Sequence, residues 1–171
     1  VAGNLPTPPP TENPPRPTDK WVIACTGRVN RKKNIAFGLK VLAGIELEKP
    51  VEVRVYGPPE DPEYLNEILS LSNPDSGLSI AHMGSLNHEE LSVEYLKAHF
   101  LLLSTLHENF GHSIAEAWAH GCPVIIADTT PWRDLEAKGI GWELPLQPEA
   151  WARGLAQALA LELEQRQALP D

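Results

Sequence analysis

The chain has 171 residues, of which 14 are Lys or Arg and 23 are Asp or Glu, so its formal net charge is −9. The acidic balance argues against general nucleic-acid binding, and no apolar run approaches the ~20 residues that span a bilayer. Two cysteines, Cys25 and Cys122, are too few for a disulfide framework. We expect both to be small core hydrophobes in a reduced, cytoplasmic protein.

The chain begins with a proline-rich segment. Seven of the 17 prolines precede residue 18. Because proline lacks a backbone donor and restricts the residue before it, residues 1–18 are predicted to form an extended, semi-rigid linker. Residues 19–171 are then expected to form one domain, and the linker predicts that something is attached in front of it.

Short apolar runs alternate with amphipathic stretches from residue 21 onward. Strands are predicted where runs rich in Val, Ile and Leu occur: residues 21–26, 51–56, 78–83, 100–104, 123–127 and 141–144. Helices are predicted at residues 34–44, 63–71, 89–98, 114–120 and 149–163. This alternation predicts an α/β fold with a doubly wound, Rossmann-like parallel sheet. Ligands of such sheets bind beyond the carboxyl ends of the strands.

Basic residues cluster in the turn after the first predicted strand. Four of the 14 basic residues fall within six positions, namely Arg28, Arg31, Lys32 and Lys33. Cations are unfavourable at a helix start, which is already partly positive, but a docked anion reverses the sign of that interaction. Arg28 would supply a planar bidentate donor and Lys33 a point charge. The turn is therefore a candidate phosphate site, and a solvated basic turn is the equal alternative.

A second candidate site follows the fourth predicted strand. Glu108, in a loop, and Glu116, in a predicted helix, are separated by seven residues. If the helix starts near Gly111, Glu116 lies about 7.5 Å farther along its axis. Two carboxylates beside the unpaired N–H groups of a helix start are suited to a polyol. The alternative is that both glutamates are ordinary solvated residues.

Histidines in the same stretch raise the alternative of a metal site. The spacing here is His-Glu-x-x-x-His from His107 to His112, whereas helical zinc sites use His-Glu-x-x-His, so we expect no metal. His112 is a candidate for hydrogen bonding to substrate. Ordinary surface or hydrogen-bonded roles are expected for His82, His88, His99 and His120. The sequence has no Walker A motif, no G-x-G-x-x-G after the first strand and no G-x-S-x-G nucleophile turn.

Taken together, these segments resemble the C-terminal, donor-binding half of a GT-B glycosyltransferase in the large retaining group 1 family. The matching stretches are GRVNRKKN, VYGPPED, IAHMGSLNHEEL, FLLLSTLHENFGHSIAEAWAHGCPVI and DTTPWRDLEAKGIGW. They cover nearly all of residues 21–142, and the two glutamates separated by seven residues are the most specific signature. The resemblance implies transfer of a sugar from a nucleoside-diphosphate sugar, with retention and without a metal ion or cofactor.

The resemblance also assigns roles by position. Arg28 and Lys33 would grip the donor diphosphate, Glu116 would bind the ribose, and Glu108 would be the catalytic residue that orients the transferred sugar. The rest of the implied site surrounds the donor: Asn109, Phe110, Gly111 and His112 at the sugar, Gly84, Ser85 and Leu86 at the base, and Ser104 and Thr105 along the cleft. Trp132 is expected to be structural.

The main departure from the family is the absence of its N-terminal domain, which carries the acceptor contacts. We therefore expect this chain alone to bind nucleotide sugar weakly and to transfer nothing measurable. The full-length protein is expected in the cytoplasm or at the inner membrane face. Two rival functions remain: a phosphorylase or nucleotide-sugar hydrolase with the same half-site, and a non-catalytic flavodoxin-like domain. The sequence does not specify the base, the sugar or the acceptor.

Overall fold

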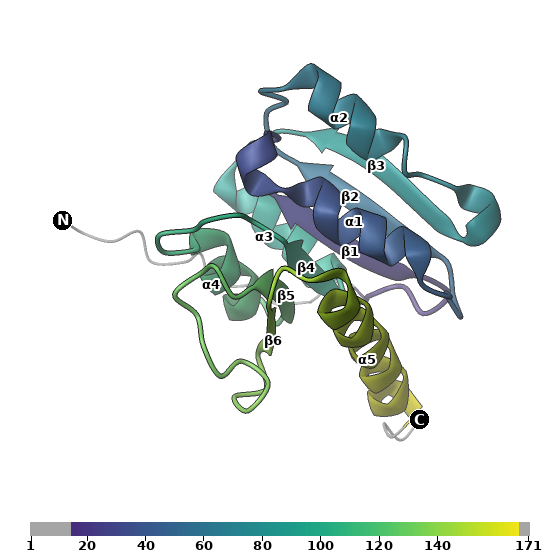
Figure 1. Cartoon of the computed structure of the whole chain (residues 1–171). Coiled ribbons are helices and arrows are strands. Elements are labelled where there is room, and N and C mark those ends of the chain that lie inside the picture. Colours follow the sequence, from purple (N-terminus) through teal and green to yellow (C-terminus); the bar gives the residue numbers. More distant parts are fainter. Residues whose placement is uncertain (1–14, 168–171) are drawn as a thin grey trace.

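The fold is a single parallel sheet with helices on both faces (Figure 1). The computed structural model describes the backbone of residues 15–167 and the side chains of residues 15–160. The strands are β1 (Trp21–Thr26), β2 (Val51–Tyr56), β3 (Leu78–Gly84), β4 (Phe100–Leu103), β5 (Val124–Ala127) and β6 (Gly141–Leu144). Their order is β3-β2-β1-β4-β5-β6, and every neighbouring pair is parallel. The predicted α/β class and Rossmann-like sheet are confirmed.

The helices are divided between the two faces of the sheet. They are α1 (Ile35–Gly44), α2 (Pro62–Leu69), α3 (His88–Lys97), α4 (His112–Ala119) and α5 (Pro148–Gln167), with two 3-10 turns, η1 (Arg31–Lys33) and η2 (Pro74–Ser76). Figure 1 shows α1, α2 and α5 on one face and α3 and α4 on the other. Among the described residues, none of these helices is long and apolar enough to cross a membrane.

Side-chain caps explain why two helices begin one residue earlier than apolar spacing predicts. The Asp61 carboxylate accepts from the Tyr64 N–H at 3.0 Å and caps α2. Asn87 and Glu90 form a reciprocal capping box at α3, with bonds of 2.9 and 3.1 Å. Hydrophobic periodicity locates the buried face of a helix but not its capping residue.

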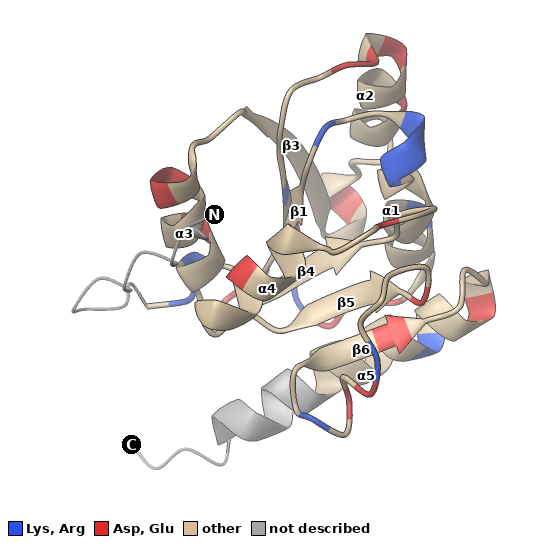
Figure 2. Ribbon diagram, turned by 90° about the vertical axis from the view of Figure 1, so that its left-hand side faces the viewer, with Lys and Arg blue, Asp and Glu red and all other residues tan. Residues whose placement is uncertain are grey.

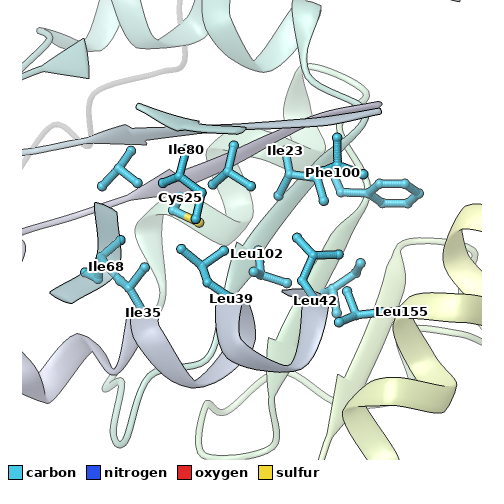
Figure 3. Close-up of a cluster of buried hydrophobic side chains, with 14 of the residues drawn as sticks. Ile23, Cys25, Ile35, Leu39, Leu42, Ile68, Ile80, Phe100, Leu102 and Leu155 are labelled. Carbon is cyan, nitrogen blue, oxygen red and sulfur yellow. The ribbon is translucent and has the colours of Figure 1, made fainter. Parts of the chain in front are cut away.

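The core consists of two hydrophobic layers separated by the sheet. Every residue of β4 is buried, as predicted for a central strand. Leu39 and Leu42 of α1 pack toward the sheet, with Leu155 of α5 beside them (Figure 3). On the opposite face, Tyr95 of α3 and Ile114 of α4 are fully buried.

The predicted linker lies mostly outside the described residues, because the description starts at residue 15. Residues 15–18 contain no helix or strand. Arg16 donates to the Gly121 carbonyl at 2.6 Å, and the His99 ring lies 3.0 Å from the Pro17 carbonyl oxygen. The same ring accepts from the Val22 N–H at 2.9 Å. The described end of the segment is therefore attached near the amino ends of β1, β4 and β5.

The strand order reverses between β1 and β4, and this switch point positions the turns that follow those two strands. The turn after β1 is also pressed against β2. The Gly27 N–H donates to the Tyr56 carbonyl at 3.0 Å, and Gly57 has a φ of 140°. A Cβ on Gly57 would lie 1.8 Å from the Gly27 carbonyl oxygen, so only glycine fits there.

Gly57→Ala is expected to lower the free energy of unfolding by about 1–3 kcal/mol, because its φ and the close approach both exclude a Cβ. Gly44→Ala is the matched control, since an added Cβ there meets nothing within 4 Å. Urea denaturation of both variants makes the comparison. A Gly57→Ala protein as stable as the parent would contradict this account of the turn.

The two cysteines are predicted to be inert in the native state. Both are buried, and burial raises the pKa of the Cys25 thiol to about 12, so it holds almost no thiolate at mildly alkaline pH. We expect a chromogenic disulfide reagent to modify neither thiol in the folded protein and both in denaturing urea. Rapid modification of the folded protein would show that the core is more open than described.

Candidate functional site

The turns after β1 and β4 are joined to each other at the switch point. The Leu106 N–H donates to the Lys32 carbonyl at 3.1 Å. The Ser104 hydroxyl donates to the Asn34 carbonyl at 2.7 Å and accepts from the Gly38 N–H at 3.2 Å. Thr105 is fully buried, and its carbonyl accepts from the Thr129 hydroxyl at 2.7 Å. Ser104 thus holds the two candidate turns together, and Thr105 joins the turn after β4 to the segment after β5.

An ion pair also joins the turn after β1 to the turn after β4. Lys33 Nζ lies 2.9 Å from Glu108 Oε2, and the side chain of each residue is 22% exposed. Asn30 caps η1, because its side-chain oxygen accepts from the Lys33 N–H at 3.2 Å. This bond fixes the position of the Lys33 backbone. Its aliphatic stem runs close to Gly27. The structure therefore brings together one member of each sequence-predicted site.

The two arginines of the basic turn, Arg28 and Arg31, face acidic partners in or beside α2. Arg28 lies 3.5 Å from Glu60 and has a side chain that is 66% exposed. Arg31 lies 3.5 Å from Asp61 and 3.3 Å from Glu67. Figure 2 shows the basic residues of this turn close to α2. Among the described contacts, Arg28 and Lys33 thus have different carboxylate partners rather than a shared one.

The start of α4 presents unpaired backbone donors. Gly111 caps the helix with a φ of 79°, so α4 begins at His112, close to the predicted start. Within residues 15–167, no protein acceptor is found for the N–H groups of Asn109, Phe110 or Gly111. Phe110 is 54% exposed, and its ring centroid lies 4.5 Å from that of His112. A main chain with free N–H groups and an exposed ring at its rim is suited to hydroxyl or phosphate oxygens.

Glu116 is held by a histidine from another element. Its Oε1 lies 3.1 Å from His88 Nδ1, and the carboxylate side chain is 29% exposed. His88 begins α3 and is separated from the turn of Gly84, Ser85 and Leu86 only by the capping residue Asn87. The contact therefore brings the predicted ribose carboxylate close to the predicted base turn.

The metal alternative has no support in the described part of the chain. No group of three or more His, Cys, Asp and Glu side chains there is arranged to hold a metal ion. His107 instead bonds to Asn109 at 2.8 Å, and His120 bonds to the Glu116 carbonyl at 2.7 Å.

Three contacts of the site were not anticipated from the sequence. The pairing of Lys33 with Glu108 joins residues that were expected to touch a ligand, not each other. His88 was expected to be ordinary, yet it contacts Glu116. The Trp132 indole N–H donates to the Phe110 carbonyl at 2.8 Å. The sequence offered one signal for the first of these contacts, namely the expected strand order. A switch point requires the carboxyl ends of β1 and β4 to be neighbours.

The sequence is similar to those of known glycosyltransferases. The sequence profile of the family described as "Glycosyl transferases group 1" matches residues 11–170. An alpha-1,3/1,6-mannosyltransferase of Rhizomucor pusillus is 25% identical over 170 residues, covering 81% of this chain and 37% of that protein. An uncharacterized glycosyltransferase of Methanocaldococcus jannaschii is 24% identical, covering 83% of this chain and 36% of that protein.

Solved structures share the fold. A glycosyltransferase of Rickettsia africae has a TM-score of 0.69 and 18% identity, covering 85% of this chain and 39% of that one. Anabaena HepE, solved in complex with UDP and glucose, has a TM-score of 0.61 and 13% identity, covering 82% of this chain and 39% of that one. This chain thus spans well under half the length of each of these four relatives. Since the family profile spans most of the sequence, the chain belongs to the glycosyl transferases group 1 family.

Proposed function

We propose that this domain binds the nucleoside-diphosphate sugar of a retaining, metal-independent glycosyltransferase. The acceptor contacts would come from a companion N-terminal domain, so this domain alone would bind the donor and transfer nothing measurable. The observation that carries the proposal is the Lys33–Glu108 pair at the switch point. Family membership and the position of this junction at the switch point of the sheet both support the proposal.

Lys33 supplies the positive charge for the donor diphosphate. Its side chain is 22% exposed, so an anion can reach it. A diphosphate carries more negative charge than one carboxylate and offers more oxygens, and it can therefore replace Glu108 as the partner of Lys33. Arg28 can add a second cation, because exposed ion pairs such as Arg28–Glu60 are worth only about 0–1 kcal/mol and are readily exchanged.

The start of α4 supplies fixed donors for the sugar. A retaining transfer must stabilise a departing nucleoside diphosphate and an oxocarbenium-like sugar. The N–H groups of Asn109, Phe110 and Gly111 are already in place and need no reorganisation during the reaction. Glu108, once the diphosphate has taken its place at Lys33, would be released to orient the sugar hydroxyls.

Glu116 and the turn after β3 would hold the nucleoside. The Glu116 carboxylate is partly exposed and can accept from both ribose hydroxyls after leaving His88. The turn of Gly84, Ser85 and Leu86 would border the base. The HepE structure, a fold neighbour that contains UDP and glucose, supports a ligand of this class.

Calorimetric titration with UDP, GDP and ADP tests the proposal. We expect the domain to bind one of them, and binding to survive added EDTA. Lys33→Ala and Glu116→Ala are each expected to weaken binding by about 10-fold to 150-fold, because each removes a charge-assisted contact. Arg28→Ala should cost less, since its side chain is more exposed than that of Lys33.

Lys32→Ala is the matched control, because Lys32 is an exposed neighbour in η1 that contributes its backbone carbonyl to the junction. It should bind like the parent. A domain indifferent to all three nucleotides would refute the donor site. If the Lys33 and Glu116 variants bound like the Lys32 variant, the residue assignments would be wrong.

Glu108→Gln should change nucleotide binding in the opposite direction to Lys33→Ala. Removing the anion that competes for Lys33 is expected to strengthen nucleoside diphosphate binding by up to about fivefold, since a partly exposed pair is worth at most about 1 kcal/mol. The double variant should bind better than Lys33→Ala alone, because no unpaired carboxylate then repels the diphosphate. Glu89→Gln, an exposed change on α3, is the control. Weaker nucleotide binding by Glu108→Gln would count against displacement of Glu108 by the diphosphate.

A further inference from the structure

The connection between β5 and β6 reaches back to the start of α4 through one tryptophan. Trp132 lies in this connection, and its Nε1–H donates to the Phe110 carbonyl at 2.8 Å. Its ring is half-buried against the hydrophobic cluster beneath α3 and α4. The proposed function assigns no role to Trp132. This bond nevertheless acts on the same peptide that supplies one of the proposed sugar donors.

The bond fixes the orientation of the peptide between Phe110 and Gly111. None of the described peptide bonds is cis, and in a trans peptide the C=O and N–H point in opposite directions. Because the Phe110 carbonyl points toward the indole, the Gly111 N–H points away from it. Gly111 is buried, and no protein acceptor is found for its N–H within residues 15–167. A backbone donor at a helix start that has no protein acceptor is available to a ligand.

The surrounding contacts keep the indole in place. The Trp132 N–H donates to the Thr130 hydroxyl at 3.2 Å, and Arg133 donates to the Asp128 carbonyl at 2.9 Å. Arg133 also donates to the Trp132 carbonyl at 2.7 Å. The loop is thus tied to itself on both sides of the tryptophan.

Glycine at position 111 allows the indole to approach this closely. A Cβ there would lie 3.2 Å from Trp132 Nε1 and 2.7 Å from Ile114 Cδ1. The φ of 79° also favours glycine. The contact between the Trp132 indole and the Phe110 carbonyl therefore depends on the absence of a side chain at position 111.

We propose that Trp132 is a positioning residue that presents the Gly111 N–H to the sugar end of the donor. This inference rests on the proposed function. If the inference holds, the domain binds a nucleotide sugar more tightly with the Trp132 indole N–H than without it, whereas the affinity for the bare nucleotide does not depend on this group. The nucleotide half of the ligand lies at Lys33 and Glu116, where Trp132 has no described contact.

Trp132→Phe tests the inference, because it removes the N–H and keeps an aromatic ring. Calorimetry would compare UDP with UDP-glucose, or GDP with GDP-mannose, according to which nucleotide the parent binds. We expect the bare nucleotide to bind as in the parent and the nucleotide sugar about 2-fold to 12-fold more weakly. Trp118→Phe is the matched control, since Trp118 is 40% exposed on α4 and should leave both affinities unchanged.

Amide NMR gives a second readout that does not depend on the variant being stable. In the parent, the Trp132 indole proton should exchange slowly, and the Gly111 amide should shift on addition of the nucleotide sugar but less with the bare nucleotide. If the Trp132→Phe affinities match the parent for both ligands, or fall equally for both, the inference is overturned. If the parent itself binds none of the nucleotides, it is the proposed function that has failed.

Discussion

The candidate site depends on the contacts that join the turn after β1 to the turn after β4. These turns belong to strands that are far apart in sequence but adjacent in the sheet. Ser104 bridges them from below, and Lys33 meets Glu108 above. If the turns were separate, a cation and a carboxylate would stand on independent loops. Joined, they form one surface on a rigid, fully buried pair of strands.

The same ion pair compensates two charges within the domain. A lone ammonium beside a helix start would be unfavourable, and so would a lone carboxylate in a partly buried loop. In this structure each neutralises the other, and in the proposed function a diphosphate replaces the carboxylate. Glu116 of α4 also has a protein partner, His88 of α3. Both carboxylates of the family signature thus have protein partners in this structure, and a ligand would act by exchanging those partners.

Much of the fold could be predicted from the sequence because its signals are local. Apolar runs of strand length identified all the described strands, and their alternation with helices fixed the parallel sheet. Helix ends were less accurate, since Asp61 and Asn87 act through capping bonds that periodicity does not register.

The sequence predicted which residues belong to the candidate site but not which of them contact each other. The sequence identified Lys33, Glu108 and Glu116 as chemically distinctive, but which charges meet depends on side-chain conformations and long-range packing. Arg28 lies beside Glu60 because the turn after β2 is adjacent to the turn after β1. Trp132 was expected to be structural, and only coordinates could reveal that its N–H reaches the Phe110 carbonyl.

The attachment of residues 15–18 at the amino ends of the strands has a mechanical consequence. β1 begins close to this attachment and ends at Thr26, and a strand of its length spans about 20 Å. It is buried along its whole length and hydrogen-bonded on both sides, so it is stiff. A displacement of the chain ahead of Trp21 is therefore expected to be passed along β1 to the turn after it without bending the strand.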